Sequence, residues 1–462
     1  MALIFNNLII NKNSNRFQPF LFNLVSGRRK LLTADEFKII CSIMTKQSDF
    51  SLNQPNQFNQ TEQMLFDKLK AEKQFFTDED RNIIEAKILK AGYFDIDYKQ
   101  ADEFTFTIEL TRNCNMRCVY CYIKPYINNN MYLTKNHIDA IYNFYHTYSD
   151  DPAKIDTTPI IGITGGEPLS NDETVELINY IVSKWPESKL KLLTNGVNLL
   201  KYYNKLPLKS IESVSVSLDG PKEIHLERRY HGLSPEAKIY DDIIKGIKIL
   251  LENEIAVKVS SVIDKSNYHH YKELMNLLFR ENISCSPLFE HDFGLTLDYS
   301  HPLDIDCNFN TKEDVYKIKD HFFDLGMRMQ PLFLSSSKLF EALGRSNNEP
   351  MIPKHQRCNS SFLANYYFAC DGNVYFCDCV DDGKGVVGTY FPNISVDKDI
   401  VSKLQNRSTM NNDKCRICPY KFVCLGGCLL SARKQNKEMV CGIYEDEEIL
   451  DNLEFNYYWI TN

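Results

Sequence analysis

The sequence has no surplus of basic residues and no long apolar run. Its 462 residues include 53 Lys and Arg against 61 Asp and Glu, and the mean hydropathy is −0.35. Binding to a phosphate backbone depends on cationic side chains, so this balance disfavours nucleic acid as a partner. No stretch approaches the ~20 apolar residues of a membrane helix, and no cation precedes the short apolar start MALIFNNLIINKN. We therefore expect a soluble, cytoplasmic protein with no membrane partner.

Disulfides are not expected either, because a reducing cytoplasm keeps thiols reduced and long domains do not need covalent staples. The sequence nevertheless has 15 cysteines. Cys41, Cys285 and Cys307 stand alone and are expected to be small buried hydrophobic residues. The other twelve form three groups, which lie at 114–121, 358–379 and 415–441. These groups indicate metal or catalytic thiol chemistry.

The length fits about three domains, and residues 1–95 are predicted to form the first because they contain no grouped cysteine. The patterns predict a hairpin over 17–32 and helices over 33–44, near 64–74 and over 78–91. The first of these helices is opened by a capping box from Thr33 to Glu36. The module is therefore predicted to have a small winged-helix-like fold.

From 104 to about 290, short β runs alternate with helical stretches. The predicted strands are FTFTIEL, PIIGIT, KLKLL, SVSVSL, AVKVSSV and ISCSPLF, and helices are predicted at 134–148, 172–184, 236–253 and 269–281. This alternation suits right-handed βαβ crossovers and predicts an α/β fold with a parallel sheet or partial barrel. Sites in such sheets lie at the C-terminal ends of the strands, where Cys114, Gly165 and Thr194 fall.

The rest of the chain changes character. Residues 311–350 predict a helical connector, and the segment 351–450 is irregular and rich in cysteine, with a hairpin predicted at CDGNVYFC. The sequence therefore predicts a third domain organised by metal.

The first cysteine group, TRNCNMRCVYCY, places Cys114, Cys118 and Cys121 on the loop after the first predicted core strand. A structural zinc site has four protein ligands, and no local His or fourth Cys completes one here. Three thiolates on a four-iron cluster leave one iron open to a substrate. The spacing CxxxCxxC, with the aromatic Tyr120 before the last cysteine, resembles the signature of the radical S-adenosylmethionine (SAM) superfamily.

This resemblance implies a partial (β/α)6 TIM-like barrel, a SAM-binding 4Fe-4S cluster on the three cysteines, and cleavage of SAM to a 5'-deoxyadenosyl radical. Gly165-Gly166-Glu167-Pro168 resembles the family's GGEP motif, which binds the methionine ammonium, and Ser217-Leu218-Asp219-Gly220 ends the fourth strand. By resemblance, Ser217 and Arg229 hold the SAM carboxylate, and Asp219 lies near the ribose or its surroundings. The implied SAM-binding set is Tyr120, Gly165, Gly166, Glu167, Thr194, Asn195, Ser217, Asp219 and Arg229. Singly, each of these residues also suits an ordinary turn, loop or surface; their order and spacing favour the SAM site.

The later cysteines resemble a SPASM domain, a seven-cysteine module that binds auxiliary 4Fe-4S clusters. By resemblance, one cluster is bound by Cys415, Cys418, Cys424 and Cys441, and the other by Cys358, Cys377 and Cys428. The alternative is a zinc ribbon, which also uses CxxC pairs. The fourth ligand of the second cluster is expected to be Cys370 or Cys379, unless the fourth iron has no protein ligand and is open. We favour Cys379. Three 4Fe-4S clusters are expected in all.

Asp378 directly follows Cys377, as a base does in anaerobic sulfatase-maturing enzymes, and is a candidate to deprotonate a substrate group. The alternative for Asp378 is a solvated side chain in the acidic run DCVDDG.

The N-terminal module resembles the PqqD-like leader-recognition domain of enzymes that mature ribosomally made peptides, in which an extended peptide adds to a strand edge. The alternative is a packing or dimerisation extension. Together the resemblances imply a maturase that installs a thioether or carbon-linked crosslink in a precursor peptide, with flavodoxin or ferredoxin as the one-electron reductant. The expected domains are 1–95 for the leader, 100–310 for the radical SAM core, 311–350 for the connector and 351–450 for SPASM. Two rivals remain, namely a formylglycine-forming sulfatase-maturing enzyme and a non-catalytic iron-sulfur carrier or zinc scaffold.

Overall fold

A computed structural model gives the fold. It describes residues 3–5, 8–10, 19–23, 29–46, 58–72, 74, 105–121, 123, 127, 131–148, 158–230, 238–295, 317–318, 321, 366–377, 385–416, 418, 426–427, 429, 432 and 436–439. The chain divides into two compact units. The first comprises Met1–Gln100, Arg328–Cys358 and Gln405–Asn462, and the second Ala101–Met327 and Asn359–Leu404.

The N-terminal part of the first unit has a four-stranded antiparallel sheet in the order β1-β2-β3-β4. Its strands are β1 (Leu3–Phe5), β2 (Leu8–Ile10), β3 (Phe20–Asn23) and β4 (Arg29–Leu31). The predicted hairpin at 17–32 is confirmed, since Phe20 of β3 pairs with Leu31 of β4. Strands β1 and β2 were not predicted.

Two helices follow this sheet, α1 (Ala34–Lys46) and α2 (Gln60–Ala71). The predicted capping box is present at α1, where the Glu36 N–H donates to Thr33 Oγ1 and the Thr33 N–H donates to the Glu36 carboxylate. Helix α2 begins earlier than the pattern near 64–74 predicted, because Asn59 and Glu62 form a second capping box. The helix predicted at 78–91 lies outside the described residues.

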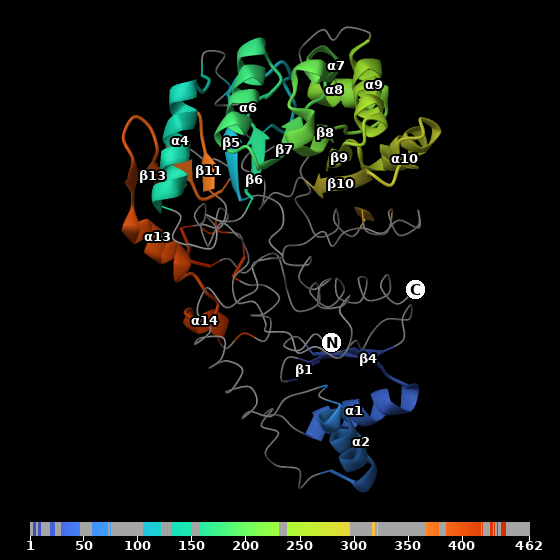
Figure 1. Ribbon diagram of the computed structural model, residues 1–462. Helices are drawn as coiled ribbons and strands as arrows, with labels where there is room; N and C mark the ends of the chain where they lie inside the picture. Colours follow the sequence, from blue (N-terminus) through green and yellow to red (C-terminus); the bar gives the residue numbers. More distant parts are fainter. Residues whose placement is uncertain are drawn as a thin grey trace. The chain divides into compact units, whose positions relative to one another are not determined.

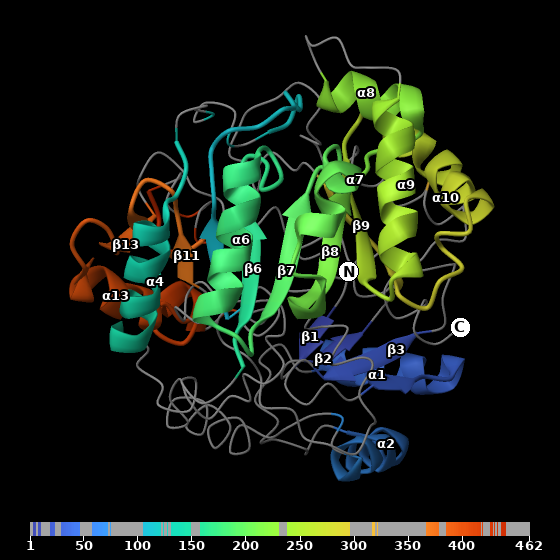
Figure 2. The same ribbon diagram turned by 45° about the horizontal axis from the view of Figure 1, so that its top comes forward.

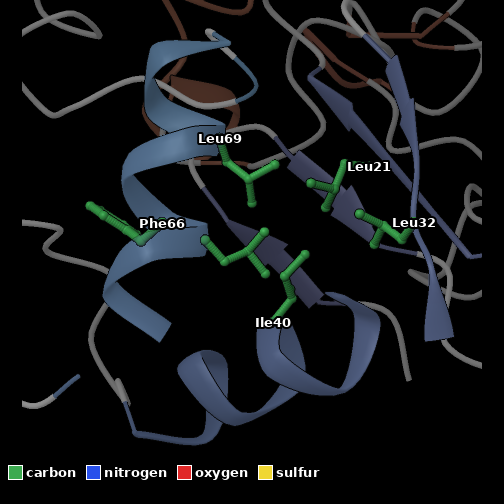
Figure 3. Close-up of a cluster of buried hydrophobic side chains, with 6 residues drawn as sticks. Leu21, Leu32, Ile40, Phe66 and Leu69 are labelled. Carbon is green, nitrogen blue, oxygen red and sulfur yellow. The ribbon is translucent and has the colours of Figure 1, made fainter. Parts of the chain in front are cut away.

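The helices and the sheet bury a common apolar cluster (Figure 3). Leu21 comes from β3, Leu32 follows β4, and Ile40 comes from α1. Helix α2 contributes Leu65, Phe66 and Leu69. Each fully buried Leu, Ile or Phe stabilises the fold by roughly 1.5–3 kcal/mol. The N-terminal module therefore has a core of its own.

The second unit contains a ten-stranded sheet (Figures 1 and 2). Six of its strands are parallel and follow chain order across the sheet: β5 (Phe106–Glu109), β6 (Ile160–Thr164), β7 (Lys189–Thr194), β8 (Ile211–Ser217), β9 (Ala256–Ile263) and β10 (Phe289–Leu295). This arrangement confirms the predicted α/β class and is consistent with a partial TIM-like barrel.

Helices connect these parallel strands. They are α4 (Lys135–Tyr148), α6 (Asp172–Lys184), α7 (Leu199–Tyr202), α8 (Lys222–Arg229), α9 (Ile239–Glu252) and α10 (Tyr271–Arg280). The predictions at 134–148 and 172–184 are confirmed almost to the residue, and α6 is capped by Asn171, whose side chain accepts from the Thr174 N–H. Figure 2 shows α4, α6 and α9 on one face of the sheet.

The predicted position of the sixth strand is wrong. The run ISCSPLF at 283–289 was expected to be the strand, whereas β10 begins at Phe289. Ile283 and Ser284 instead donate their N–H groups back to the Leu278 carbonyl and close the end of α10. Pro287 has no N–H to give to a ladder, so pairing with β9 starts only after it.

Four short strands extend the sheet beyond β5. Strand β11 (Tyr366–Phe368) runs parallel to β5, and β12 (Asn373–Tyr375), β13 (Val386–Thr389) and β14 (Ser395–Val396) follow antiparallel. The predicted hairpin at CDGNVYFC is confirmed, because the Gly372 N–H donates to the Ala369 carbonyl and closes the turn between β11 and β12. The start of the cysteine-rich region is thus built onto the core sheet.

Two further helices are α13 (Lys398–Gln405) and α14 (Asp413–Arg416). The connector predicted at 311–350 lies outside the described residues except at 317, 318 and 321. Among the helices that are described, none is both long and apolar enough to cross a bilayer.

Candidate functional site

The loop after β5 brings the first three cysteines to the C-terminal edge of the parallel strands. Its backbone is fixed to the end of α8, because the Arg117 N–H donates to the Arg229 carbonyl and the Val119 N–H to the Arg228 carbonyl, both at 2.9 Å. Cys114, Cys118 and Cys121 are all half-buried. The loop is therefore shaped by backbone hydrogen bonds that do not depend on the thiols.

Burial keeps the thiols of Cys114 and Cys118 protonated. It raises the pKa of Cys114 to about 12, with the Glu167 charge and the other two cysteines adding to the effect. It raises the pKa of Cys118 to about 11, against the lowering influence of the Arg229 charge. Metal ligation must therefore displace protons. Within the described ranges, no three His, Cys, Asp or Glu side chains are grouped to hold a single metal ion.

The Gly165-Gly166-Glu167 turn, which follows β6, lies directly against the cysteine loop. The Gly166 N–H donates to the Thr111 carbonyl at 2.7 Å, and the Glu167 N–H donates to the Asn113 carbonyl at 2.8 Å. A Cβ atom on Gly165 would lie 2.5 Å from the Thr111 oxygen, and one on Gly166 would lie 2.3 Å from the Asn113 oxygen. Both positions require glycine because the two backbones approach so closely.

Glu167 links this turn to the end of β7. One carboxylate oxygen accepts from Thr194 Oγ1 at 2.6 Å and from the Leu169 N–H at 2.9 Å, and the other accepts from the Asn195 N–H at 2.7 Å. Burial raises the pKa of Glu167, and these donors oppose the rise. Three of about four acceptor positions are thus occupied by protein donors. The structure brings Glu167, Thr194 and Asn195 together.

The Asn195 side chain continues this connection. Its Nδ2 donates to Asn115 Oδ1 in the cysteine loop at 2.7 Å. Asn115 was not singled out from the sequence, and its place between the first two loop cysteines was the only available signal. The ends of β5, β6 and β7 are therefore joined by one continuous hydrogen-bond network.

Asp219, just beyond β8, is the second centre of the site. Its carboxylate accepts from the Tyr120 hydroxyl at 2.5 Å, from the Val262 N–H at 2.9 Å, and from Arg229 Nε and Nη2 at 3.0 and 2.9 Å. Burial acts to raise the pKa of Asp219, but the charges of Arg229 and Arg228 hold it below its usual value. Asp219 therefore remains an anion in a fully buried position.

Arg229 and Tyr120 both bind Asp219. The Arg229 guanidinium donates twice to Asp219, and its Nη1 lies 3.9 Å from Cys118 Sγ. The Tyr120 ring lies beneath the guanidinium groups of Arg228 and Arg229, at 5.1 and 5.6 Å from their central carbons. Ser217 is half-buried at the end of β8 and makes no side-chain hydrogen bond within the described part of the chain.

The sequence reasoning missed Arg228. Its guanidinium pairs with buried Asp264 at 2.7 Å and lies 3.7 Å from Asp219. The available signal was the Arg228-Arg229 doublet.

A second network missed from the sequence connects the cysteine loop to the β11–β12 hairpin. Arg112 donates to buried Glu109 at 3.3 Å and to Asp371 at 3.1 Å, and the Cys370 N–H donates to Glu109 at 3.0 Å. Burial raises the pKa of Glu109, against the lowering effect of the Arg112 charge. The hairpin turn is thus bound to Arg112, which lies two positions before Cys114.

The positions of Cys370 and Cys377 bear on the open ligand question. Cys370 is buried in the turn before β12, and Cys377 follows the end of the same strand. The extended chain from Gly372 to Cys377 spans roughly 16 Å at ~3.3 Å per residue. Ligands of one cluster must approach the same irons, so Cys370 is poorly placed to share a cluster with Cys377.

The remaining predicted ligands are only partly described. Cys415 and Cys418 are half-buried in a CxxC turn, in which the Cys418 N–H donates to the Cys415 carbonyl at 3.0 Å. The residue pair Cys118 and Cys121 forms the same turn, at 3.2 Å. The predicted site residues that lie outside the described residues are Cys358, Asp378, Cys379, Cys424, Cys428 and Cys441.

The geometry agrees with a family comparison. Residues 108–278 match the model of the Radical SAM superfamily, so the chain contains a radical SAM domain.

Two curated relatives illustrate the similarity. GTP 3',8-cyclase from Clostridium perfringens (strain SM101 / Type A) is 32% identical over 184 residues, which cover 38% of this chain and 52% of the relative. The cysteine-type anaerobic sulfatase-maturating enzyme from Clostridium novyi (strain NT) is 25% identical over 356 residues, covering 71% and 86%. The chain spans about half the length of the cyclases it matches.

Two solved structures share the fold more widely. Streptococcus suis SuiB bound to the precursor peptide SuiA covers 95% of this chain and 98% of its own, with a TM-score of 0.53 and 14% identity. The enzyme anSMEcpe with bound AdoMet covers 77% of this chain and 97% of its own, with a TM-score of 0.54 and 16% identity. These similarities show a shared fold.

Proposed function

We propose that the protein is a cytoplasmic radical SAM/SPASM maturase that installs a thioether or carbon-linked crosslink in a ribosomally made precursor peptide. The observation that carries the proposal is the convergence of the three-thiol loop, the Gly165-Gly166-Glu167 turn and the Asp219 centre at one edge of the sheet. Together with Thr194 and Asn195 at the end of β7, these residues come from the ends of four successive parallel strands, where such folds place their sites.

The residues present suit the cofactors of this chemistry. Cys114, Cys118 and Cys121 would hold a 4Fe-4S cluster as thiolates. The Gly165-Gly166-Glu167 turn would accept from the methionine ammonium of SAM, and Ser217, with the N–H groups of Arg229 that Asp219 does not use, would bind its carboxylate. When bound, the cluster and SAM would supply a 5'-deoxyadenosyl radical that removes hydrogen from the peptide.

The other side chains of the site orient these groups. Glu167 holds Thr194 and Asn195 at the end of β7, where they would lie near the ribose of SAM. Asp219 binds Tyr120 of the cysteine loop and Arg229 of α8, and so joins the two. Glu167 and Asp219 are buried, and such anchors would help to keep water from the site and so protect a reactive radical from side reactions.

We further propose two auxiliary 4Fe-4S clusters, for three in total. Cys415, Cys418, Cys424 and Cys441 would bind one. Cys358, Cys377, Cys428 and Cys379 would bind the other, with Asp378 as a base toward the substrate. Closing a crosslink removes two hydrogens from the peptide, and these clusters would accept the second electron and pass it onward. Flavodoxin or ferredoxin would supply the first electron.

The N-terminal module is proposed to bind the leader of the precursor. Residues 1–95 would bind the leader, 100–310 would form the radical SAM core, 311–350 the connector and 351–450 the SPASM domain. A four-stranded sheet has two edge strands, here β1 and β4, whose unpaired main-chain groups suit an extended peptide. The fold similarity to SuiB, a protein solved with a precursor peptide, covers 95% of the chain and supports this assignment.

A sulfatase-maturing enzyme is the second candidate, favoured by the similarity to the Clostridium novyi enzyme over 86% of its length. The fold of anSMEcpe covers less of this chain than SuiB does, so we prefer the crosslinking function.

Removal of residues 1–95 tests the preference. The truncated protein should bind a candidate precursor more weakly while still cleaving SAM slowly in the absence of peptide. The product separates the two candidates: a crosslink lowers the peptide mass by two hydrogens and keeps the sulfur, whereas formylglycine formation from cysteine loses the sulfur. Equal precursor affinity with and without the module, measured by fluorescence anisotropy, would contradict leader binding.

A further inference from the structure

The arginine beside Cys118 is held rigidly. Arg229 Nη1 lies 3.9 Å from Cys118 Sγ, while Nε and Nη2 of the same guanidinium donate to the two oxygens of Asp219. Such a forked pair restrains both the position and the plane of the guanidinium. The cation therefore cannot swing away from the thiol without breaking two charge-assisted hydrogen bonds.

The carboxylate that holds Arg229 is itself fixed. The Tyr120 hydroxyl, which comes from the cysteine loop, and the Val262 N–H, which comes from β9, both donate to Asp219. Asp219 is 1% exposed and Arg229 is 6% exposed. Salt and water screen such buried charges far less than surface charges, so the guanidinium acts on its surroundings through a low effective dielectric.

A fixed cation affects the reduction of any cluster that Cys118 ligates. One-electron reduction adds one negative charge, and a nearby positive charge stabilises the reduced form more than the oxidised form. The reduction potential of iron-sulfur clusters depends on local charge, hydrogen bonds to sulfur and solvent exposure. The Asp219 carboxylate, which lies behind the guanidinium, partly offsets its effect.

We propose that the Arg229–Asp219 pair sets the reduction potential of the cluster on the cysteine loop, with Arg229 raising it and Asp219 lowering it. Arg229 is then a positioning residue for the cluster ligand as well as a candidate SAM contact. The inference rests on the cluster assignment in the proposed function, but not on the identity of the peptide substrate.

The test is a redox titration of the reconstituted full-length protein, followed by electron paramagnetic resonance in the absence of SAM. The signal of this cluster is identified by its loss in Cys118→Ala. Because SAM is absent, a role of Arg229 in SAM binding cannot change the result. Arg229→Gln should shift the midpoint potential to more negative values and lower the reduced-to-oxidised ratio at a fixed potential about tenfold. Arg229→Lys, which keeps the charge, should shift it much less.

Arg228→Gln is the matched control. Arg228 is also buried and also faces Asp219, but its main partner is Asp264. Its replacement removes the same charge and should have a clearly smaller effect. Equal shifts for the Arg228 and Arg229 variants, or no shift for Arg229→Gln, would overturn the proposal.

The sign of the shift separates electrostatics from structural damage. Asp219→Asn removes the opposing charge and should move the potential to more positive values. If Arg229→Gln fails to bind iron, Asp219→Asn and Arg229→Lys provide the test instead. An unchanged or more negative midpoint potential in Asp219→Asn rejects the inference. A failure of the peptide maturase function would leave these potentials unchanged, so the two ideas fail separately.

Discussion

Arg112, at the start of the cysteine loop, donates a 3.1 Å hydrogen bond to Asp371, which lies 259 positions later in the chain, in the turn of the β11–β12 hairpin. The same guanidinium contacts Glu109 at the end of β5, and Glu109 in turn accepts from the Cys370 N–H. A buried ion network therefore joins the first and second cysteine groups within one unit.

Glu109→Gln should destabilise this unit by about 3 kcal/mol, because it leaves the buried Arg112 cation partly uncompensated. Urea unfolding of the apoprotein measures the change. Asp172→Asn is the control, since Asp172 and its partner Lys205 are both more than half exposed, and we expect no measurable effect. Equal stability of the Glu109 variant and the wild type would show that the network does not support the fold.

Cys118→Ala should abolish SAM cleavage, because it removes a ligand of the cluster that delivers the electron. Production of 5'-deoxyadenosine by the reduced, reconstituted protein is the measurement. With three four-iron clusters, the wild type should contain about twelve irons, and the triple variant of Cys114, Cys118 and Cys121 to Ala about eight. Cys285→Ala should change neither value, because Cys285 is remote from these groups in sequence and is exposed; the expectation that it would be buried is wrong, since it lies in the surface turn after α10. A zinc scaffold would hold no iron in any variant.

Cys379→Ala should alter the spectrum and iron content of the auxiliary cluster assigned to Cys377, and Cys370→Ala should not. The reason is that β12 separates Cys370 from Cys377. Iron analysis and Mössbauer spectroscopy distinguish the variants. If the Cys370 change alone lowers the iron content, the ligand assignment must be reversed. If neither change matters, the iron has an open position, and an added thiol should perturb its spectrum.

Gly166→Ala should prevent the cysteine loop from adopting its position, because the new methyl group would lie 2.3 Å from the Asn113 oxygen. Iron bound at the first cluster should fall by more than half, as judged by the signal that Cys118→Ala removes. Gly294→Ala is the matched control, since a Cβ atom at that position in β10 would meet nothing within 4 Å. Normal loading of the Gly166 variant would contradict the close approach of the two loops.

His225 should make the fold sensitive to acid. Burial, with the charges of Arg229 and Arg228 adding to it, lowers the pKa of His225 to about 3 from 6.5. Between these values the unfolded state binds the additional proton, so stability falls as the pH drops. From pH 7 to pH 5 the loss from this group is about 2 kcal/mol. His225→Gln should remove this part of the pH-dependent loss of stability. His146→Gln, on the exposed side of α4, should leave the loss unchanged. Unfolding curves at both pH values provide the comparison.

The sequence predicted the elements whose signals are local. The hairpin at 17–32, the capping box of Thr33 and Glu36, and the helix at 172–184 each follow from neighbouring residues, and the structure contains them. The sixth strand was misplaced because the apolar residues of 283–289 resemble a strand, while the chain there closes a helix. Hydrophobicity alone does not distinguish these two outcomes.

Glycine and cysteine spacing pointed to the candidate site residues that the sequence proposed, and the residues that it missed are those whose role depends on burial. Nothing in the sequence marks Arg112, Arg228 or Asp264 as buried, because an isolated charged residue is usually exposed. Their partners are 3 to 259 positions away. Such long-range pairs follow from the sheet order, which places β11 beside β5, and that order was not available from local patterns.

The hairpin that follows β11 acts as a spacer of fixed length. Strand β11 runs with β5 and β12 runs against it, so Cys377 has returned toward the sheet edge opposite the one at which the Cys114 loop begins. The separation between the two ligand groups is set by the number of residues in one strand and is maintained by main-chain hydrogen bonds. Loss of one residue from β12 would bring the groups closer by one step and also turn its buried side chains, such as Val374, to the opposite face. The length of β12 therefore determines both the separation of Cys377 from the Cys114 loop and which β12 side chains are buried. An insertion or deletion in this strand changes the two together.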